Sequence, residues 1–191
     1  MRNTRAIMTV VALATVISFA AIPYGAVAAP TPGKPALIIS AGQSTDGLIL
    51  KQVLTDRATK ETIPYIQMAE PKDLSGIKTL IIAVGVSNKG LGAAGIDIDK
   101  EISRVRSVLS EAKKNDCYII LAHIGGSARR GGTSDQMSRL VASYAHHIII
   151  VNDSNEDAFF TKLGAEEKIS VISVEGRTQV GPEINKLISG K

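Results

Sequence analysis

The sequence has few aromatic residues and a single cysteine. Of its 191 residues, 4% are aromatic, none is Trp, and Cys117 is the only cysteine. A single cysteine excludes an internal disulfide. So few aromatic rings disfavour the stacking surfaces that bind large glycans or single-stranded nucleic acid. Because Cys117 directly precedes an apolar run, we expect a buried, inert thiol.

The chain also lacks a large excess of either charge. It has 22 Lys and Arg against 18 Asp and Glu, which gives a net charge of +4. Without Arg2 and Arg5 of the amino-terminal segment, 20 basic residues face 18 acidic ones. Nucleic-acid binding requires a strongly basic face. The composition therefore predicts no nucleic-acid partner.

The first 28 residues have the three parts of a secretory signal peptide. Arg2 and Arg5 precede an apolar stretch at 7–21, and small residues follow up to Ala28. We predict cleavage after Ala28, because cleavage one residue later would place Pro30 next to the broken bond. The apolar stretch is shorter than the ~20 residues that span a bilayer, so an uncleaved anchor is the less favoured alternative.

Beyond the signal peptide, the chain is long enough for one domain with an ordinary core. Removing 28 of the 191 residues leaves 163, a length that suits a single domain. We expect a short Pro-rich leader at 29–35 and one domain at 36–191. No further segment is long and apolar enough to span a membrane. The mature protein is predicted to be exported, periplasmic or extracellular, and not membrane-bound.

Apolar runs alternate with amphipathic segments along the mature chain. The expected strands lie at 36–39, 64–68, 79–84, 118–122, 147–151 and 169–174, and the expected helices begin near residues 46, 97, 135, 157 and 182. Strands that are apolar on both faces are typical of a parallel sheet covered by helices. The pattern predicts an α/β fold with a single doubly wound, mostly parallel sheet of five or six strands, either flavodoxin-like or Rossmann-like.

Four loops of this sheet are rich in Gly, Ser, Asn and basic residues. Ligands of such sheets bind outside the carboxyl ends of the strands, which selects loops 40–45, 85–95, 123–134 and 152–155. We expect these loops to meet at one edge. The candidate ligand-binding residues are Gln43, Ser44, Ser87, Asn88, Lys89, Gly125, Gly126, Arg129, Arg130 and Ser134.

The loop at 123–134 has the composition of an anion-binding site. Its four glycines allow backbone N–H groups to face one point at the start of a helix. Arg129 and Arg130 add forked donors for carboxylate, phosphate or sulfate. The alternative is that both arginines are solvated and the glycines only turn the chain. Thr133 and Gln136 have capping-box spacing, which explains part of the loop by helix initiation.

Two glycine-rich segments approach nucleotide-binding motifs and depart from both. Residues 126–133 fit G-x-x-x-x-G-K-[ST] except that Gly132 replaces the lysine. Residues 90–95 match G-x-G-x-x-G but begin well after the strand end, and His123 follows the next strand where an acidic residue is expected. We therefore predict no cofactor, and we interpret the second segment as a mobile flap.

The main alternative to simple binding is a hydrolase or transferase that uses the same cleft, and whether the protein is an enzyme stays open. His123 at a strand end is the candidate base. Its potential partners are the hydroxyls of Ser44, Ser87 and Ser134 and the carboxylates of Asp135 and Asp153. No G-x-S-x-G elbow supports such a triad.

A metal site is not expected, and a protein partner stays open. His146 and His147 are adjacent, so in a strand they would point to opposite faces and could not chelate one metal. A third alternative is a protein-interaction module that docks a partner through its loops. The favoured hypothesis is an extracytoplasmic domain that binds a small anionic ligand.

Three segments in the same order resemble one family. They are Ser40-Ala-Gly-Gln-Ser44, Gly90-Leu-Gly-Ala-Ala-Gly-Ile-Asp97 and Gly125-Gly-x-x-Arg-Arg-Gly-x-x-Ser-Asp135. In these motifs the mature chain resembles a family of exported bacterial proteins with a domain of unknown function, DUF6305. The resemblance implies a bacterial source and a flavodoxin-like α/β fold. It implies no activity, substrate or functional residue.

Overall fold

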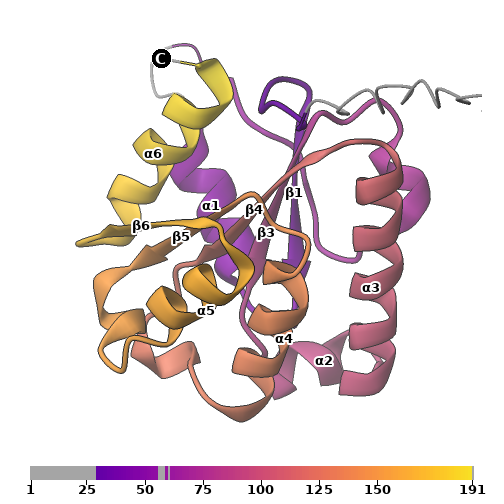
Figure 1. Cartoon of the computed structure of the whole chain (residues 1–191). Helices are drawn as coiled ribbons and strands as arrows, with labels where there is room; N and C mark the ends of the chain where they lie inside the picture. Colours follow the sequence, from indigo (N-terminus) through magenta and orange to yellow (C-terminus); the bar gives the residue numbers. More distant parts are fainter. Residues whose placement is uncertain (1–28, 56–58, 60, 191) are drawn as a thin grey trace, which may run out of the picture.

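A six-stranded parallel sheet runs through the protein, and helices cover both of its faces (Figure 1). The computed structural model describes residues 29–55, 59 and 61–190, so the predicted signal peptide at 1–28 lies outside the described residues. The strands are β1 (Ala36–Ala41), β2 (Tyr65–Ile66), β3 (Thr79–Val84), β4 (Tyr118–His123), β5 (His147–Val151) and β6 (Ser170–Val174). Every neighbouring pair is parallel. The predicted fold class is confirmed.

The strand order is β2-β1-β3-β4-β5-β6. Its first five strands have the order of the flavodoxin-like arrangement, so the structure decides between the two orders that the sequence left open. The chain leaves β1 for β2 on one side and then returns to β3 on the other side. The order therefore reverses between β1 and β3, and the crevice at that point is where ligands of such sheets usually bind.

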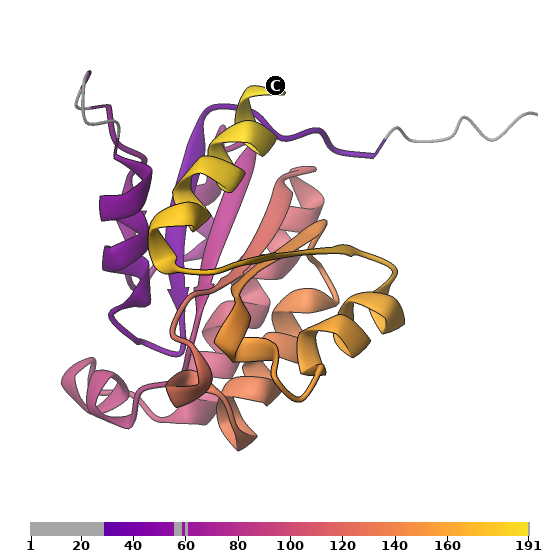
Figure 2. The ribbon, with the colours of Figure 1, turned by 90° about the vertical axis from the view of Figure 1, so that its left-hand side faces the viewer.

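Alternate side chains of the central strands pack into two apolar cores, one on each face of the sheet. Ile38, Ile81 and Ile120 pack under α1 (Asp46–Leu54) and α6 (Arg177–Ser189). The opposite face packs under α3 (Ile98–Lys114), α4 (Gly132–Ala142) and α5 (Phe159–Glu167). Figure 2 shows the sheet between these two layers. Each fully buried Ile or Leu contributes roughly 1.5–3 kcal/mol, so the continuous apolar strands stabilise both layers.

Four short helices complete the chain: η1 (Pro71–Leu74), α2 (Asn88–Ala93), η2 (Ser127–Arg129) and η3 (Asn152–Asn155). The last three follow β3, β4 and β5 at the carboxyl edge of the sheet, at the bottom of Figure 1. No helix in the described ranges is long and apolar enough to cross a membrane.

Helix boundaries differ from the predicted ones where side chains cap backbone N–H groups. The last helix was predicted from residue 182, because proline favours a helix start. It begins at Arg177 instead, where the Gln179 side chain accepts the N–H of Gly176 at 2.9 Å. The preceding helix starts at Phe159, because the Asp157 carboxylate accepts the Phe159 N–H at 3.1 Å.

Candidate functional site

The four candidate loops meet at the carboxyl edge of the sheet, as expected. Gln43 of the first loop forms an antiparallel bridge with Val86 of the second. The Val86 N–H donates to the Ser134 hydroxyl at the end of the third loop, at 3.0 Å. The His123 ring is 3.0 Å from the hydroxyl of Ser154 in the fourth loop. The loops are therefore joined to one another by direct contacts.

A buried ion pair holds the loop that follows β1. The Glu101 carboxylate accepts the Gly42 N–H at 2.8 Å and the Gln43 side-chain amide at 3.0 Å. Arg104 donates to Glu101 at 2.8 Å. Burial alone would raise the pKa of Glu101, but Arg104 and these N–H donors lower it below its usual value. Gln67 donates to the Gln43 side-chain oxygen at 3.0 Å. Both the nitrogen and the oxygen of the Gln43 side-chain amide are therefore hydrogen-bonded within the protein.

The predicted flap is wrong over Asn88–Ala93, which form α2. The Ser87 hydroxyl caps this helix by accepting the Gly90 N–H at 3.1 Å. Gly90 lies directly against the backbone carbonyl of the β1–α1 loop, with no space for a Cβ atom. Lys89 is exposed at the start of the helix. Tight packing therefore accounts for Gly90, and a φ of 68° accounts for Gly95.

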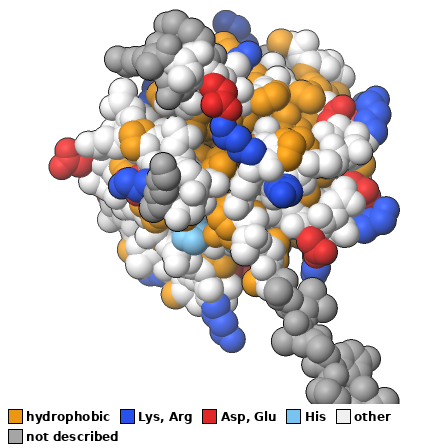
Figure 3. All heavy atoms as spheres, turned by 90° about the horizontal axis from the view of Figure 1, so that it is seen from above, with side chains coloured by type: hydrophobic (Ala, Val, Ile, Leu, Met, Phe, Trp, Pro, Cys, Tyr) orange, Lys and Arg blue, Asp and Glu red, His pale blue; other side chains and the backbone are white. Residues whose placement is uncertain are grey.

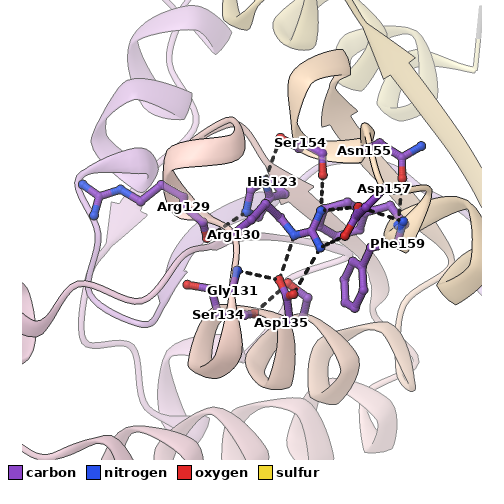
Figure 4. A network of polar contacts seen from close by, with 12 residues as sticks. His123, Arg129, Arg130, Gly131, Ser134, Asp135, Ser154, Asn155, Asp157 and Phe159 are labelled. Carbon is purple, nitrogen blue, oxygen red and sulfur yellow. Dashed lines mark hydrogen bonds and ion pairs between the residues drawn. The ribbon is translucent and has the colours of Figure 1, made fainter.

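Arg130 lies in a closed network of polar contacts (Figure 4). It donates to both carboxylate oxygens of Asp135, at 2.7 and 3.1 Å, and to both of Asp157, each at 3.0 Å. A fifth hydrogen bond goes to the Ser154 carbonyl, and the guanidinium lies 4.3 Å from the centroid of the Phe159 ring. An arginine has five N–H donors. Arg130 therefore has no donor left for a ligand.

The same network sets the charge state of two carboxylates. The hydrogen bond from Arg130 lowers the pKa of Asp135 and lowers that of Asp157 to about 2. Asp135 also accepts the Gly131 N–H at 3.2 Å, and α4 begins one residue later at Gly132. This contact caps the helix in place of the predicted capping box at Thr133.

Arg129 has a different environment from its neighbour. Its side chain is half-buried against Gly125, and Figure 4 shows its guanidinium extended away from the Arg130 network. In the part of the chain that the structure describes, this guanidinium forms no hydrogen bond or ion pair. The backbone N–H groups of residues 125–128 donate no hydrogen bond there either. Arg129 and these four amides are therefore available donors.

His123 is a buried anchor between η2 and η3. Its Nε2 is 3.3 Å from the Arg129 carbonyl oxygen, and its Nδ1 is 3.0 Å from the Ser154 hydroxyl. The carbonyl can only accept, so Nε2 carries the proton and Nδ1 accepts from Ser154. Burial lowers the pKa of His123, which favours this neutral form. With both ring nitrogens occupied and no exposed surface, the geometry gives no support to His123 as a base.

The other triad candidates have separate partners. Ser44 donates to the Asp46 carboxylate at 2.9 Å, Ser87 caps α2, and Ser134 accepts the Val86 N–H. None of them hydrogen-bonds to His123, whose hydroxyl partner is Ser154. The sequence analysis missed both Ser154 and Asp46. Asp46 is only 2% exposed, a burial that its position at a helix start did not indicate.

The histidine pair does not separate to opposite faces of the sheet. β5 begins at His147, so His146 precedes the strand and is not bound by strand alternation. Both rings lie against Tyr118, with ring centroids at 4.7 Å for His146 and 5.9 Å for His147. Among residues 29–55, 59 and 61–190, no group of three or more potential metal ligands is found.

Cys117 is buried at 1% exposure. Its thiol donates to the Ile77 carbonyl oxygen at 3.1 Å. Burial raises the pKa of the thiol above its usual value. A thiol in this environment stays protonated and is a poor nucleophile.

Two hollows bear on the site. One, of about 360 Å³, is acidic, and its walls include Arg130, Asp135, Asp153, Glu156 and Asp157. Because Arg130 is already paired, this hollow is unfavourable for an anion.

The other hollow, of about 670 Å³, lies at the opposite, amino edge of the sheet, between Pro35, Ile63 and Ile188. Figure 3 looks on to that edge and shows hydrophobic side chains gathered on part of it. Its rim charges, Lys34 and Glu61, pair with each other.

Comparison with known proteins identifies the family but no relative of known activity. A search of curated proteins found no match. The model of the family described as a domain of unknown function, DUF6305, matches residues 33–188, which include every strand and nearly all of α6. The three motifs that suggested the resemblance lie within this match. The chain belongs to the DUF6305 family.

Proposed function

We propose that this protein is an exported domain that binds a small anionic ligand at the carboxyl edge of its sheet. The observation that carries the proposal is the state of Arg129. Its guanidinium is unpaired in the described part of the chain, and four backbone N–H groups of the same loop, at 125–128, also lack acceptors there. Guanidinium and backbone N–H groups are the donors that proteins use for carboxylate, phosphate and sulfate.

The residues around these donors hold the loop in one conformation. Gly126 has a φ of 71°, a conformation that favours glycine, and it starts η2. His123 binds the Arg129 carbonyl, and Arg130 fastens the following turn to Asp135 and Asp157. In the proposal, Arg130 is therefore a positioning residue, and Arg129 is the contact to the ligand. A held loop loses less entropy on binding than a mobile one.

The location of the donors agrees with the topology. Gly125 lies two residues after the end of β4, and Lys89 lies on the helix that follows β3. The strand order reverses between β1 and β3, and β4 is the next neighbour of β3, so both loops lie near the usual ligand position in such sheets. Lys89 is exposed, and we include it as a second cation for the ligand.

Substitution of Arg129 tests the binding proposal. The probes are inorganic phosphate, sulfate and acetate. Their binding is measured by thermal shift and by NMR titration of the Gly125 and Gly126 amides. Because a charge-assisted hydrogen bond contributes roughly 1.5–3 kcal/mol, Arg129→Ala should weaken binding about ten- to a hundredfold. Arg129→Lys should restore only part of the affinity, since an ammonium lacks the planar fork.

Arg106→Ala is the matched control, because Arg106 is an exposed arginine in α3 and belongs to none of the four candidate loops. It should bind each probe as the wild type does. If the wild type binds none of the probes, or if Arg129→Ala binds them equally well, the proposal is wrong.

Export is tested separately from binding. The proposed signal peptide predicts a mature amino terminus at Ala29. Intact-mass measurement of protein recovered outside the cytoplasm should show the loss of residues 1–28. Recovery of that protein with Met1 still attached would contradict the processing proposal and leave the binding proposal standing.

A further inference from the structure

Among the residues that the structure describes, Asp46 is a buried carboxylate with no basic partner. Its side chain is at the start of α1, and only 2% of the residue is exposed. Oδ2 accepts one hydrogen bond, from the Ser44 hydroxyl at 2.9 Å. In the described residues, Oδ1 accepts none and no Lys, Arg or His forms an ion pair with Asp46. A buried carboxylate is costly unless it is paired and hydrogen-bonded, so this one lacks the partners that normally justify its burial.

Asp46 faces the same place as Arg129. Its Oδ2 lies 3.0 Å from the position that a Cβ atom on Gly125 would occupy, and the Arg129 side chain covers that position too. Oδ2 is also 3.0 Å from the equivalent position on Gly85, at the end of β3. The carboxylate therefore lies over the ends of two central strands, and only glycine at 85 and 125 leaves room for it.

Asp46 Oδ2 and the Cβ and Cγ atoms of Arg129 all lie near Gly125, and in the described residues the two side chains form no ion pair. The free oxygen is not sealed in the interior, since Asp46 Oδ1 is not among the fully buried atoms that lack a hydrogen bond. A bare anion next to Arg129 would be repelled by this carboxylate. A ligand that presents a hydrogen-bond donor to Asp46 removes that repulsion and supplies the missing partner.

We infer that the ligand is a small acid with an ammonium or hydroxyl group on the carbon next to its carboxylate. Such a molecule places an acceptor and a donor a few bonds apart, which suits an arginine and a carboxylate that both lack a charged partner in the described residues and that both have side-chain atoms beside Gly125. The acid group binds Arg129 and the amides of 125–128, and the donor binds Asp46 Oδ1. The inference rests on the proposed function and assigns it a ligand class.

Three probes of equal carbon skeleton test the inference: alanine, lactate and propionate. Each is titrated into the purified wild-type protein, and the Gly125 and Gly126 amide resonances are followed by NMR. Alanine or lactate should bind at least about tenfold more tightly than propionate, the size expected for one charge-assisted hydrogen bond. Asp46→Asn should reduce that preference to about twofold or less. Asp99→Asn, an exposed carboxylate in the first turn of α3, should leave it unchanged.

The outcomes separate the inference from the proposed function. If propionate binds as tightly as alanine and lactate, and binding still depends on Arg129, the ligand class is wrong and anion binding stands. If the wild type shows the preference but Asp46→Asn keeps it, the assignment to Asp46 is wrong. If none of the three probes binds while phosphate, sulfate or acetate still binds through Arg129, the inference is wrong and the anion-binding proposal stands. The wild-type comparison decides the ligand class even where Asp46→Asn does not fold.

Discussion

Arg129 and Arg130 are consecutive residues with opposite environments: the Arg129 guanidinium extends away from the network in which Arg130 donates to Asp135 at 2.7 Å. A donor saturated by the protein holds the fold, and a donor without an acceptor is free for a ligand. From the sequence, both arginines were predicted to bind the anion. In the structure, Arg130 is fully bonded within the protein and Arg129 is not, and this difference is measurable.

Arg130→Ala should lower the free energy of unfolding by about 2 kcal/mol, because it leaves the partly buried Asp135 carboxylate and the carbonyl of buried Ser154 without their donor. Arg129→Ala should change it by about 0.5 kcal/mol or less. Urea denaturation of both variants and the wild type measures the difference. Equal stability of the two variants would show that the Arg130 network is not a structural element.

The packing of α2 predicts opposite effects for two glycines of the same helix. A Cβ on Gly90 would meet the Gln43 carbonyl oxygen, whereas a Cβ on Gly92 has no atom within 4 Å. Gly90→Ala should therefore destabilise the protein by about 1–3 kcal/mol, as overpacking does. Gly92→Ala should be neutral or stabilise it by up to about 1 kcal/mol, because alanine favours a helix. Thermal denaturation compares the two, and a mobile flap would tolerate both changes alike.

The Glu101–Arg104 pair predicts a large effect on stability. Glu101 is fully buried and the Arg104 side chain is 11% exposed. Arg104→Ala would leave Glu101 charged and without its main partner, at a cost of about 3–5 kcal/mol. The control is Arg106→Ala on the exposed face of the same helix, with an expected change of about 0.5 kcal/mol or less. Urea denaturation that finds the two variants similar would contradict the role of the pair.

The three histidines predict loss of stability in mild acid. Burial lowers the pKa of His123, His146 and His147 below the usual value of 6.5. The unfolded chain takes up protons near that pH and the folded chain does not, so the free energy of unfolding falls as the pH drops below about 6.5. Denaturation at pH 8 and pH 5.5 should show this decrease.

The ring signals of His123 give an independent check by NMR. They should keep the shifts of a neutral imidazole with a proton on Nε2 at a pH where exposed imidazoles titrate. A His123 that titrates at its ordinary pKa would disprove the anchored, neutral form.

The local pattern of the sequence was enough for the architecture and for the edge that carries the candidate site. Apolar runs such as 79–84 and 118–122 read as strands buried on both faces, because each strand packs against helices on both sides. Once the sheet is parallel, the loops after its strands share one edge by geometry. The convergence of Gln43, His123 and Ser134 therefore followed from chain order alone.

Contacts between residues far apart in the chain determine which side chains at that edge keep unpaired donors or acceptors. Arg130 is occupied by Asp157, 27 residues away, and Gln43 by Glu101, 58 residues away. Gly90 becomes part of a helix that packs on the β1–α1 loop, and Asp46 is buried at the ends of β3 and β4. Periodicity and motifs describe neighbours along the chain, whereas hydrogen bonds and steric contacts join residues that only folding brings together. Local sequence patterns were therefore sufficient to predict the sheet and the edge where its loops meet, whereas long-range pairing left the Arg129 guanidinium, and not that of Arg130, with available donors.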